Sequence, residues 1–452
     1  MSLTTQELRL FLEELCCELC RFRHMQEAAL PPDALRIERE YALAPGGPYA
    51  DVHVCSTMPP RGPSPHFIEI KFGVPDDELL SRLRLKYGRS LPGHSLATHL
   101  IVVLDLQNRS DAAGLLRAIR SAVIPSLSVE VWDEPRLLSE IEHTFHVRAP
   151  AIDEVHLLDM RDAIQREMAS YAFSSTTPAS LAKPPHDITS WSRESEPPAL
   201  DAVKEQLLWR FAFWRLRQIR QAKNLSPREI LPPGTYHGVA VVIADLCSFS
   251  SYVRDTPNDP IVRDCLTSFY SKARYEVVNR GGMVENFVGD QVLALFGVPD
   301  RCPGYIEHAL QAAQALLSVG EAVSDYWQRQ IDRQQPSSGM HIGIAYGDLQ
   351  IVSLRPSCRA NSTAIADVIN VAARLMNMAG PGEILVANSY YQQLSTAARA
   401  PLQPIAPQDA RNVGRLRAWR LPAADAESQT SPLPSQPLPT SASSGQPQGH
   451  TP

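Results

Sequence analysis

Residues 283–296, MVENFVGDQVLALF, constrain the fold of this chain more than any other stretch. Two alternating apolar runs meet at Gly289-Asp290, and glycine at the first central position of a two-residue loop favours a type II′ turn. The pattern predicts a β-hairpin with the Asp290 carboxylate at its tip. Upstream, VAVVIADLCSFS (239–250) predicts a buried strand that ends at Asp245. Brought together by a fold, Asp245 and Asp290 would clamp two metal ions on a nucleoside triphosphate.

Further segments follow in a fixed order between residues 237 and 421. The segments are IADLCSF, GGMVENFVGDQVLALFGVP, MHIGIAYGD, DVINVAARL and PGEILVANSYYQQL, and the strand-like GRLRAWRL closes the series. Together they resemble the catalytic domain of the class III nucleotide cyclases, the adenylate and guanylate cyclase family. The resemblance covers under half of the chain and implies an α+β fold, with a ferredoxin-like βαββαβ cyclase domain over 237–421.

The resemblance also implies a reaction and a metal site. The ribose 3′-hydroxyl attacks the α-phosphorus, pyrophosphate leaves, and two Mg²⁺ or Mn²⁺ ions per active site assist. Asp245 and Asp290 match the metal-binding aspartates of the family, and the carbonyl of Leu246 matches its backbone ligand. An aspartate that closes a strand is commonly a turn or capping residue, but the flanking motifs favour the metal role here.

Asn370 and Arg374 in ADVINVAARLM are four residues apart, so a helix projects them from one face. In the family the matching asparagine orients the ribose, and the matching arginine stabilises charge on the phosphate in the transition state. The alternative is an ordinary solvated helix face. Family sites form between head-to-tail subunits, and this domain carries both halves of a site. The resemblance therefore implies a homodimer with two equivalent sites.

Spacing from Asp290 and Asn370 places the base-selecting positions of the family at Asn286 and Thr363. Thr363 accepts a hydrogen bond from adenine N6, whereas the Asn286 amide both donates and accepts and so pairs with adenine or with uracil. An adenylate cyclase is favoured. A pyrimidine (UTP or CTP) cyclase of the kind found in bacterial antiphage defence is the alternative. A further alternative is a catalytically silent nucleotide sensor that controls the N-terminal domain.

Composition describes an ordinary globular protein of 452 residues. A net charge of -6 argues against a dominant phosphate-binding surface. No apolar run reaches membrane-spanning length and the N-terminus is unlike a signal peptide, so we expect a cytoplasmic protein without membrane contact. Cys16, Cys17 and Cys20 lie in a helical pattern and are expected to be buried thiols.

The chain divides into five segments by pattern and composition. They are a mixed α/β domain over 1–172 in the order αββαβαβ, a Ser-, Thr- and Pro-rich flexible linker over 173–200, a connecting helix within 201–236, the cyclase domain over 237–421 and a disordered tail over 422–452. The connecting helix is expected either to pair with its copy or to pack on its own domain.

In the N-terminal domain, Asp51 lies near one predicted strand, and FIEIKFG places Glu69 and Lys71 on the same face of the next. This arrangement resembles the restriction-endonuclease-like PD-(D/E)XK family, in which Asp and Glu hold Mg²⁺ and Lys activates water. The resemblance implies DNA contact, with Glu14 on the first helix as an extra ligand. The alternative is a sensory domain in which Glu69 and Lys71 form a surface ion pair.

Overall fold

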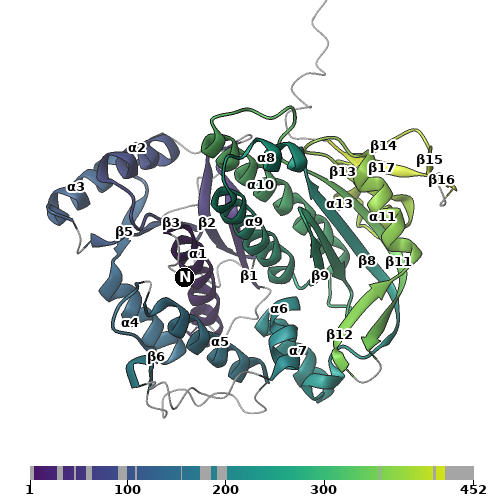
Figure 1. Cartoon of the computed structure of the whole chain (residues 1–452), viewed down its shortest axis with the longest axis horizontal. Helices are drawn as coiled ribbons and strands as arrows, with labels where there is room; N and C mark the ends of the chain where they lie inside the picture. The colour runs from purple at the N-terminus through teal and green to yellow at the C-terminus, as the bar shows by residue number, and fades with distance from the viewer. Residues whose placement is uncertain are drawn as a thin grey trace, which may run out of the picture.

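The computed structural model describes residues 5–27, 34–44, 47–57, 64–89, 99–106, 109–153, 155–173, 185–190, 201–355, 358–410 and 414–422. Its two principal sheets have five and eight strands and are flanked by helices, which makes the chain a mixed α+β protein (Figure 1). Within the described ranges, no helix is both long enough and apolar enough to cross a membrane.

The N-terminal sheet has the order β1-β2-β3-β4-β5, antiparallel from β1 to β3 and parallel from β3 to β5. Alternation along β4 buries Leu100 against α2 and α3 and Ile101 on the other face with α1 and α4. The elements are α1 (Thr5–Glu27), β1 (Leu35–Ala42), β2 (Tyr49–Ser56), β3 (His66–Ile70), α2 (Asp76–Tyr87), β4 (His99–Val103), α3 (Ala112–Ala122), β5 (Ser128–Trp132), α4 (Glu134–Phe145), β6 (Val147–Arg148), α5 (Leu157–Phe173) and β7 (His186–Asp187).

Strand β1 corrects the predicted order αββαβαβ, because the structure has three consecutive strands after α1. Its sequence, LRIEREYA, carries four charged residues and does not read as a buried strand. Glu38, Arg39 and Glu40 are nevertheless buried. The charges of Glu38 and Glu40 are compensated by Arg280 and Lys272, more than two hundred positions away, and that of Arg39 by Glu13 of α1, which no local pattern reveals.

Part of the predicted linker is ordered against the N-terminal domain. Strand β7 pairs in parallel with β6, and the neighbouring Ile188 is buried. The remainder of that linker, 174–184 and 191–200, and the predicted tail from residue 423 lie outside the described residues.

The predicted single connecting helix is wrong, because the chain forms α6 (Ala202–Arg210) and α7 (Phe213–Lys223). The break falls at Phe211, which is extended at φ -131° and ψ 156° and fully buried. A straight helix could not direct Phe211 and Phe213 into the same core. Helix α7 packs on α5, where Arg217 donates to the Tyr171 carbonyl at 2.7 Å. The helices therefore pack on their own chain.

The C-terminal sheet has the order β14-β17-β13-β11-β8-β10-β9, with β12 paired to β11. The central strand β8 is buried continuously from Val239 to Ala244. The elements are β8 (Gly234–Leu246), α8 (Phe249–Asp255), α9 (Asp259–Asn279), β9 (Met283–Val288), β10 (Gln291–Phe296), α10 (Tyr305–Ile331), β11 (Met340–Arg355), β12 (Cys358–Ile365), α11 (Asp367–Met378), β13 (Ile384–Ala387), α12 (Asn388–Tyr391), α13 (Thr396–Arg399), β14 (Gln403–Pro404), β15 (Gln408–Ala410), β16 (Gly414–Leu416) and β17 (Ala418–Leu421).

The two halves of the molecule meet through α9, which lies beside α1 and β1 (Figure 1). We call their contact the charged junction, because buried and partly buried polar residues cross it. These contacts are Arg39 with Glu276 and Ser271, Lys272 with Glu40 and Glu13, Arg280 with Glu38, Arg274 with Glu14, Asn279 with Arg21 and Ile37, and Tyr49 with Glu321 of α10. The largest apolar cluster also includes residues of both halves, so they share one core.

Candidate functional site

The hairpin predicted from residues 283–296 is confirmed. Gln291 pairs with Val288, which leaves Gly289 and Asp290 as a two-residue loop. Gly289 has φ +62°, and Asp290 is not among the residues with positive φ, as a type II′ turn requires. The turn therefore leaves the Asp290 carboxylate, which is partly exposed, at the hairpin tip.

Asp245 lies beside this tip. Strand β10 pairs with β8 so that Gln291 is opposite Asp245, one residue from Asp290. Burial and the neighbouring Asp245 carboxylate together raise the pKa of Asp290 to about 6. Strand β8 ends at Leu246, the third residue of the predicted metal set, whose side chain is buried. The fold thus brings the two aspartates together where β8 ends beside the β9–β10 turn.

His341 is part of this site and was missed by sequence reasoning. It pairs across from Asp245 in the β11–β8 ladder, and its Nε2 lies 3.1 Å from Asp245 Oδ2. That hydrogen bond is the main cause that raises the pKa of His341. His341 is the second residue of the quoted segment MHIGIAYGD. The alternating pattern of that segment indicates a strand, but the register that places it opposite Asp245 is not readable from it.

Asn370 and Arg374 lie on α11, and both are exposed. In the part of the chain that the structure describes, no hydrogen bond or ion pair occupies either side chain. Helix α11 packs tightly on the sheet at Gly343, where an added Cβ would lie 2.1 Å from the Ala372 carbonyl oxygen. Glycine at this position therefore sets how closely the helix that presents the pair approaches β11.

The two predicted base-facing residues lie on neighbouring segments. Asn286 is exposed on β9 and pairs with Leu293, whereas Thr363 is partly buried on β12 and pairs with Val352. The segments are joined by a hydrogen bond of 2.9 Å from the Ala364 amide to Glu285 Oε1. Asn286 directly follows Glu285, and Thr363 directly precedes Ala364, so this hydrogen bond joins the immediate neighbours of the two base-facing residues.

In the N-terminal domain the fold brings Asp51, Glu69 and Lys71 together, as the sequence pattern predicts. Lys71 Nζ lies 2.6 Å from both Asp51 Oδ2 and Glu69 Oε2. All three residues are buried. The predicted extra ligand Glu14 is not part of this cluster, because it lies 3.5 Å from Arg274 of the charged junction.

Two side chains of α2 also contact these carboxylates. Lys86 Nζ lies 2.7 Å from Glu69 Oε2, and Tyr87 donates to Glu69 Oε1 at 2.6 Å. Burial opposes ionisation of Asp51, but Lys71, Lys86 and Arg9 hold its pKa well below its usual range. The described residues contain no cluster of three His, Cys, Asp or Glu side chains suited to a metal. The structure therefore shows a paired ionic cluster at this place.

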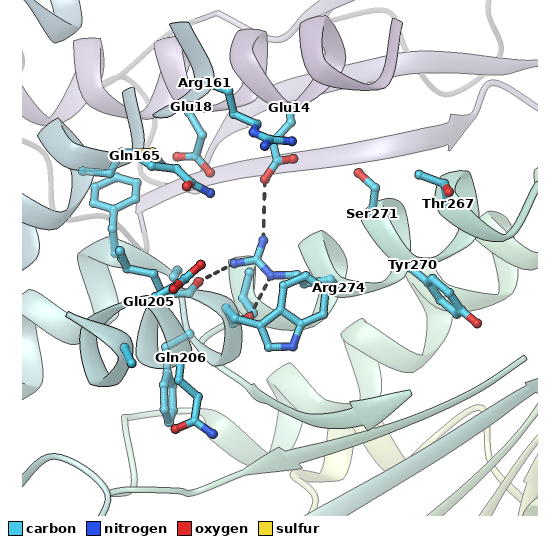
Figure 2. A pocket seen from close by; sticks show the side chains of 18 residues that line it. Glu14, Glu18, Arg161, Gln165, Glu205, Gln206, Thr267, Tyr270, Ser271 and Arg274 are labelled. Atoms are coloured by element: carbon cyan, nitrogen blue, oxygen red, sulfur yellow. Dashed lines mark hydrogen bonds and ion pairs between the residues drawn. The ribbon is translucent and has the colours of Figure 1, made fainter. Parts of the chain in front are cut away.

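A cavity of about 800 Å³ lies between α1, α5, α6 and α9, beside the charged junction (Figure 2). Arg274 lies in its middle and donates to the carbonyls of Leu208 and Trp209. Glu18 points into the cavity from α1, and its Oε2 atom is buried without a hydrogen-bond partner among the described residues. Burial raises the pKa of Glu18 to about 7.

Glu18→Gln is expected to stabilise the protein at pH 8 and to leave its stability at pH 5 nearly unchanged. The folded protein holds the Glu18 proton up to about pH 7, whereas the unfolded chain releases it near the ordinary glutamate pKa of 4.5, so stability falls as pH rises between these values. Partial solvent access reduces the effect at pH 8 to roughly 1–3 kcal/mol. Thermal unfolding of parent and variant at both pH values measures it. Equal differences at pH 5 and pH 8 would contradict the assignment.

Comparison with known proteins finds relatives for part of the chain. No family model matches the chain. It is 29% identical over 169 residues to the uncharacterized protein Rv1318c of Mycobacterium tuberculosis, covering 37% of this chain and 29% of that protein. It is 27% identical over 163 residues to the uncharacterized protein Rv1319c of the same organism, covering 36% of this chain and 28% of that protein. The chain thus spans under a third of the length of these relatives.

Among solved structures, adenylyl and guanylyl cyclase domains are similar to this chain. The guanylyl cyclase Cya2 is 18% identical with a TM-score of 0.36, over 42% of this chain and 93% of that chain. The adenylyl cyclase CyaB from P. aeruginosa is 19% identical with a TM-score of 0.37, over 42% of this chain and 95% of that chain.

Proposed function

We propose that residues 237–421 form a nucleotide cyclase, which converts a nucleoside triphosphate to a 3′,5′-cyclic nucleotide and pyrophosphate in the cytoplasm. The observation that carries the proposal is that Asp245, near the end of the central strand β8, lies beside Asp290 in the β9–β10 turn. Support also comes from the exposed Asn370 and Arg374 and from the ordered series of cyclase-like segments. The core that holds these residues is proposed to be the ferredoxin-like βαββαβ unit of the family.

The donor groups of this site are suited to two Mg²⁺ or Mn²⁺ ions. Carboxylate and carbonyl oxygens are the ligands that these hard cations prefer. Asp245, Asp290 and the Leu246 carbonyl would hold the ions, and a bound triphosphate would supply further oxygens. Bound there, the ions would activate the 3′-oxygen and neutralise the departing pyrophosphate. The raised pKa of Asp290 is consistent with two carboxylates that need a cation between them.

Asn370 and Arg374 are proposed to act on substrate held by the aspartates of a second subunit. Arg374 stabilises negative charge on the phosphate in the transition state, and Asn370 orients the ribose. Their exposure, with no partner within the described part of the chain, leaves both side chains free for this contact. A head-to-tail homodimer with two equivalent sites follows, because each subunit carries both halves.

We propose adenine as the preferred base, with UTP or CTP as the alternative substrates. Thr363 accepts from adenine N6, and the Asn286 amide pairs with adenine or uracil. The test is incubation of the purified protein with each of the four nucleoside triphosphates and Mn²⁺, with mass spectrometry of the products. Cyclic AMP as the main product supports the proposal, whereas cyclic UMP or CMP selects the pyrimidine alternative. Nucleotide binding without any cyclic product would support the silent sensor and refute the cyclase.

Asn286→Lys is expected to shift substrate preference toward ATP. An ammonium only donates hydrogen bonds, so it donates to adenine N1 and cannot accept from uracil N3-H. An unmatched polar group costs about 1–3 kcal/mol, which corresponds to a change of roughly tenfold or more in the ATP-to-UTP ratio of kcat/KM. Steady-state kinetics with both substrates measures the ratio. An identical ratio in parent and variant would show that residue 286 does not contact the base.

A second candidate function, Mg²⁺-dependent DNA cleavage, is favoured by one observation in the N-terminal domain. Asp51 lies on β2, Glu69 on β3 and Lys71 directly after β3, yet Lys71 Nζ lies 2.6 Å from both carboxylates. In a nuclease, Lys86 would have to leave the carboxylates before a metal binds, because it lies 2.7 Å from Glu69.

Nicking of supercoiled plasmid in the presence of Mg²⁺ tests this second candidate. The parent and Lys86→Ala are expected to nick, and Lys71→Ala is expected to lose nicking while it retains nucleotide cyclisation. Intact plasmid with both the parent and Lys86→Ala would leave the cluster as a purely structural ion-pair group.

A further inference from the structure

Arg210 is a buried arginine at the last position of α6 that contacts two distant segments. Its NH1 lies 3.0 Å from Glu285 Oε2 on β9, and its NH2 donates to the Ser362 carbonyl on β12 at 2.8 Å. Arg210 and Glu285 have exposed fractions of 7% each. A buried ion pair is retained only when its geometry and remaining hydrogen bonds are good, and removal of one partner leaves an uncompensated charge.

Glu285 occupies an irregular position of its strand. The β9–β10 register shifts here, because Leu293 pairs with Asn286 and the next residue, Ala294, pairs with Val284. Glu285 is therefore the extra residue of a β-bulge, a feature that redirects side chains. Its second oxygen accepts from the Ala364 amide at 2.9 Å. The bulge thus directs one carboxylate to both α6 and β12.

These contacts surround the two base-facing positions. Glu285 precedes Asn286, and Thr363 lies between Ser362 and Ala364, which both contact the pair. We propose that Arg210 and Glu285 are positioning residues that set the separation of Asn286 and Thr363, and with it the choice of nucleotide base. This inference rests on the proposed cyclase function. It makes α6 part of the specificity apparatus although no α6 side chain need touch the nucleotide.

Helix α6 is in turn held by the charged junction. Arg274 of α9 donates to the carbonyls of Leu208 and Trp209 at 2.5 and 2.7 Å, directly before Arg210, and lies 3.5 Å from Glu14 of α1 (Figure 2). The Trp209 ring is 6.3 Å from that of Phe287, next to Asn286. The N-terminal domain thus reaches the base-facing hairpin through α9 and α6, and a cavity of about 800 Å³ lies beside α6.

The second wall of the cavity contacts the same hairpin. Tyr270 lines the cavity from α9, and its hydroxyl donates to the Gly289 carbonyl at 2.6 Å, next to Asp290. A displacement of α6 or α9 at the cavity is therefore transmitted to both the base-facing residue and the metal-binding tip. Regulation of the proposed site by the N-terminal domain is expected to follow this route.

Arg210→Gln, Arg210→Lys and Glu285→Gln test the proposal, with Arg217→Gln as the matched control. Arg217 is also a buried arginine, but it contacts Tyr171 of α5 and neither hairpin. Two quantities are measured for each variant: the ATP-to-UTP ratio of kcat/KM, and hydrogen exchange of the β9 and β12 amides in nucleotide-free protein.

Arg210→Gln is expected to change the ratio about tenfold and to accelerate exchange in both strands, since several polar contacts are lost. Arg210→Lys keeps the pair with Glu285 but not the contact with the Ser362 carbonyl, so it is expected to lie between parent and Arg210→Gln. Glu285→Gln removes the charge and keeps only one of the two hydrogen bonds, because a glutamine amide has a single accepting oxygen, so its effect is expected to approach that of Arg210→Gln. Arg217→Gln is expected to keep the parental ratio. Folded Arg210→Gln with the parental ratio and parental exchange would overturn the proposal.

The experiment separates this inference from the cyclase proposal. A parent that cyclises no nucleotide refutes the cyclase, and the pair is then judged by exchange and by the relative affinities of fluorescent ATP and UTP analogues. Unchanged exchange and affinity ratio in Arg210→Gln would overturn it there too, whereas altered values in an active parent support both.

Discussion

Asp245→Ala and Arg374→Ala are each expected to lose nucleotide cyclisation by on the order of 10³-fold, whereas a mixture of the two proteins regains activity. Asp245 belongs to the metal-binding half of the proposed site and Arg374 to the half supplied by the second subunit. Random reassortment makes about half of the dimers heterodimers, and each has one intact site of two, so about a quarter of parental activity returns. Rates of cyclic nucleotide formation with Mn²⁺, before and after mixing, measure the effect.

The control for this experiment is a mixture of Asp245→Ala with Asp290→Ala. Both changes affect the same half-site, so no combination of subunits contains an intact site and no activity is expected to return. Absence of recovery in verified Asp245→Ala and Arg374→Ala heterodimers would refute a site shared between subunits. Recovery in the control mixture would show that the two aspartates belong to different half-sites.

Arg39→Met is expected to destabilise the protein by about 3–5 kcal/mol. Arg39 is 1% exposed, and its guanidinium donates to Glu13 at 2.8 Å and to Ser271 at 3.0 Å. Methionine fills much of the same space but leaves the Glu13 carboxylate buried with fewer cations. Calorimetric or circular-dichroism unfolding midpoints at neutral pH measure the loss.

Arg36→Met on the same strand is the matched control. The Arg36 side chain is 49% exposed and pairs with Glu38 at 2.9 Å, so its loss is expected to cost about 0–1 kcal/mol. Equal midpoints for the two variants would show that the charged junction contributes little to stability.

The success of sequence reasoning depended on how local the determining interactions are. The hairpin at Gly289 and the buried strand that contains Asp245 were predictable, because alternating apolar residues and a glycine turn are local sequence patterns. His341 was missed because its place opposite Asp245 is a matter of strand register. Strand β1 was missed because its buried charges are neutralised by Glu13 of α1 and by Lys272 and Arg280 of α9.

The break between α6 and α7 had a similar cause. Helical periodicity runs through residues 201–223, so the pattern predicted one helix, but Phe211 and the helices on either side are positioned by different tertiary surroundings. The convergence of Asp51, Glu69 and Lys71 was predicted from two strands, whereas Lys86, which shares their carboxylates, comes from α2 and shows no motif. The residues that form a cluster were thus easier to predict than the further side chains, such as Lys86, that bind the same carboxylates.

The charged junction limits how this protein can be recombined with others. A fragment that begins at residue 201 would expose Lys272, Glu276 and Arg280 of α9 without Glu40, Arg39 and Glu38. A foreign N-terminal domain grafted onto the same helix would need carboxylates and cations in matching positions, or it would leave charges unpaired in a dry interface. Gene fusions that exchange this half of the protein are therefore expected to succeed only where the outer face of α9 changes with it.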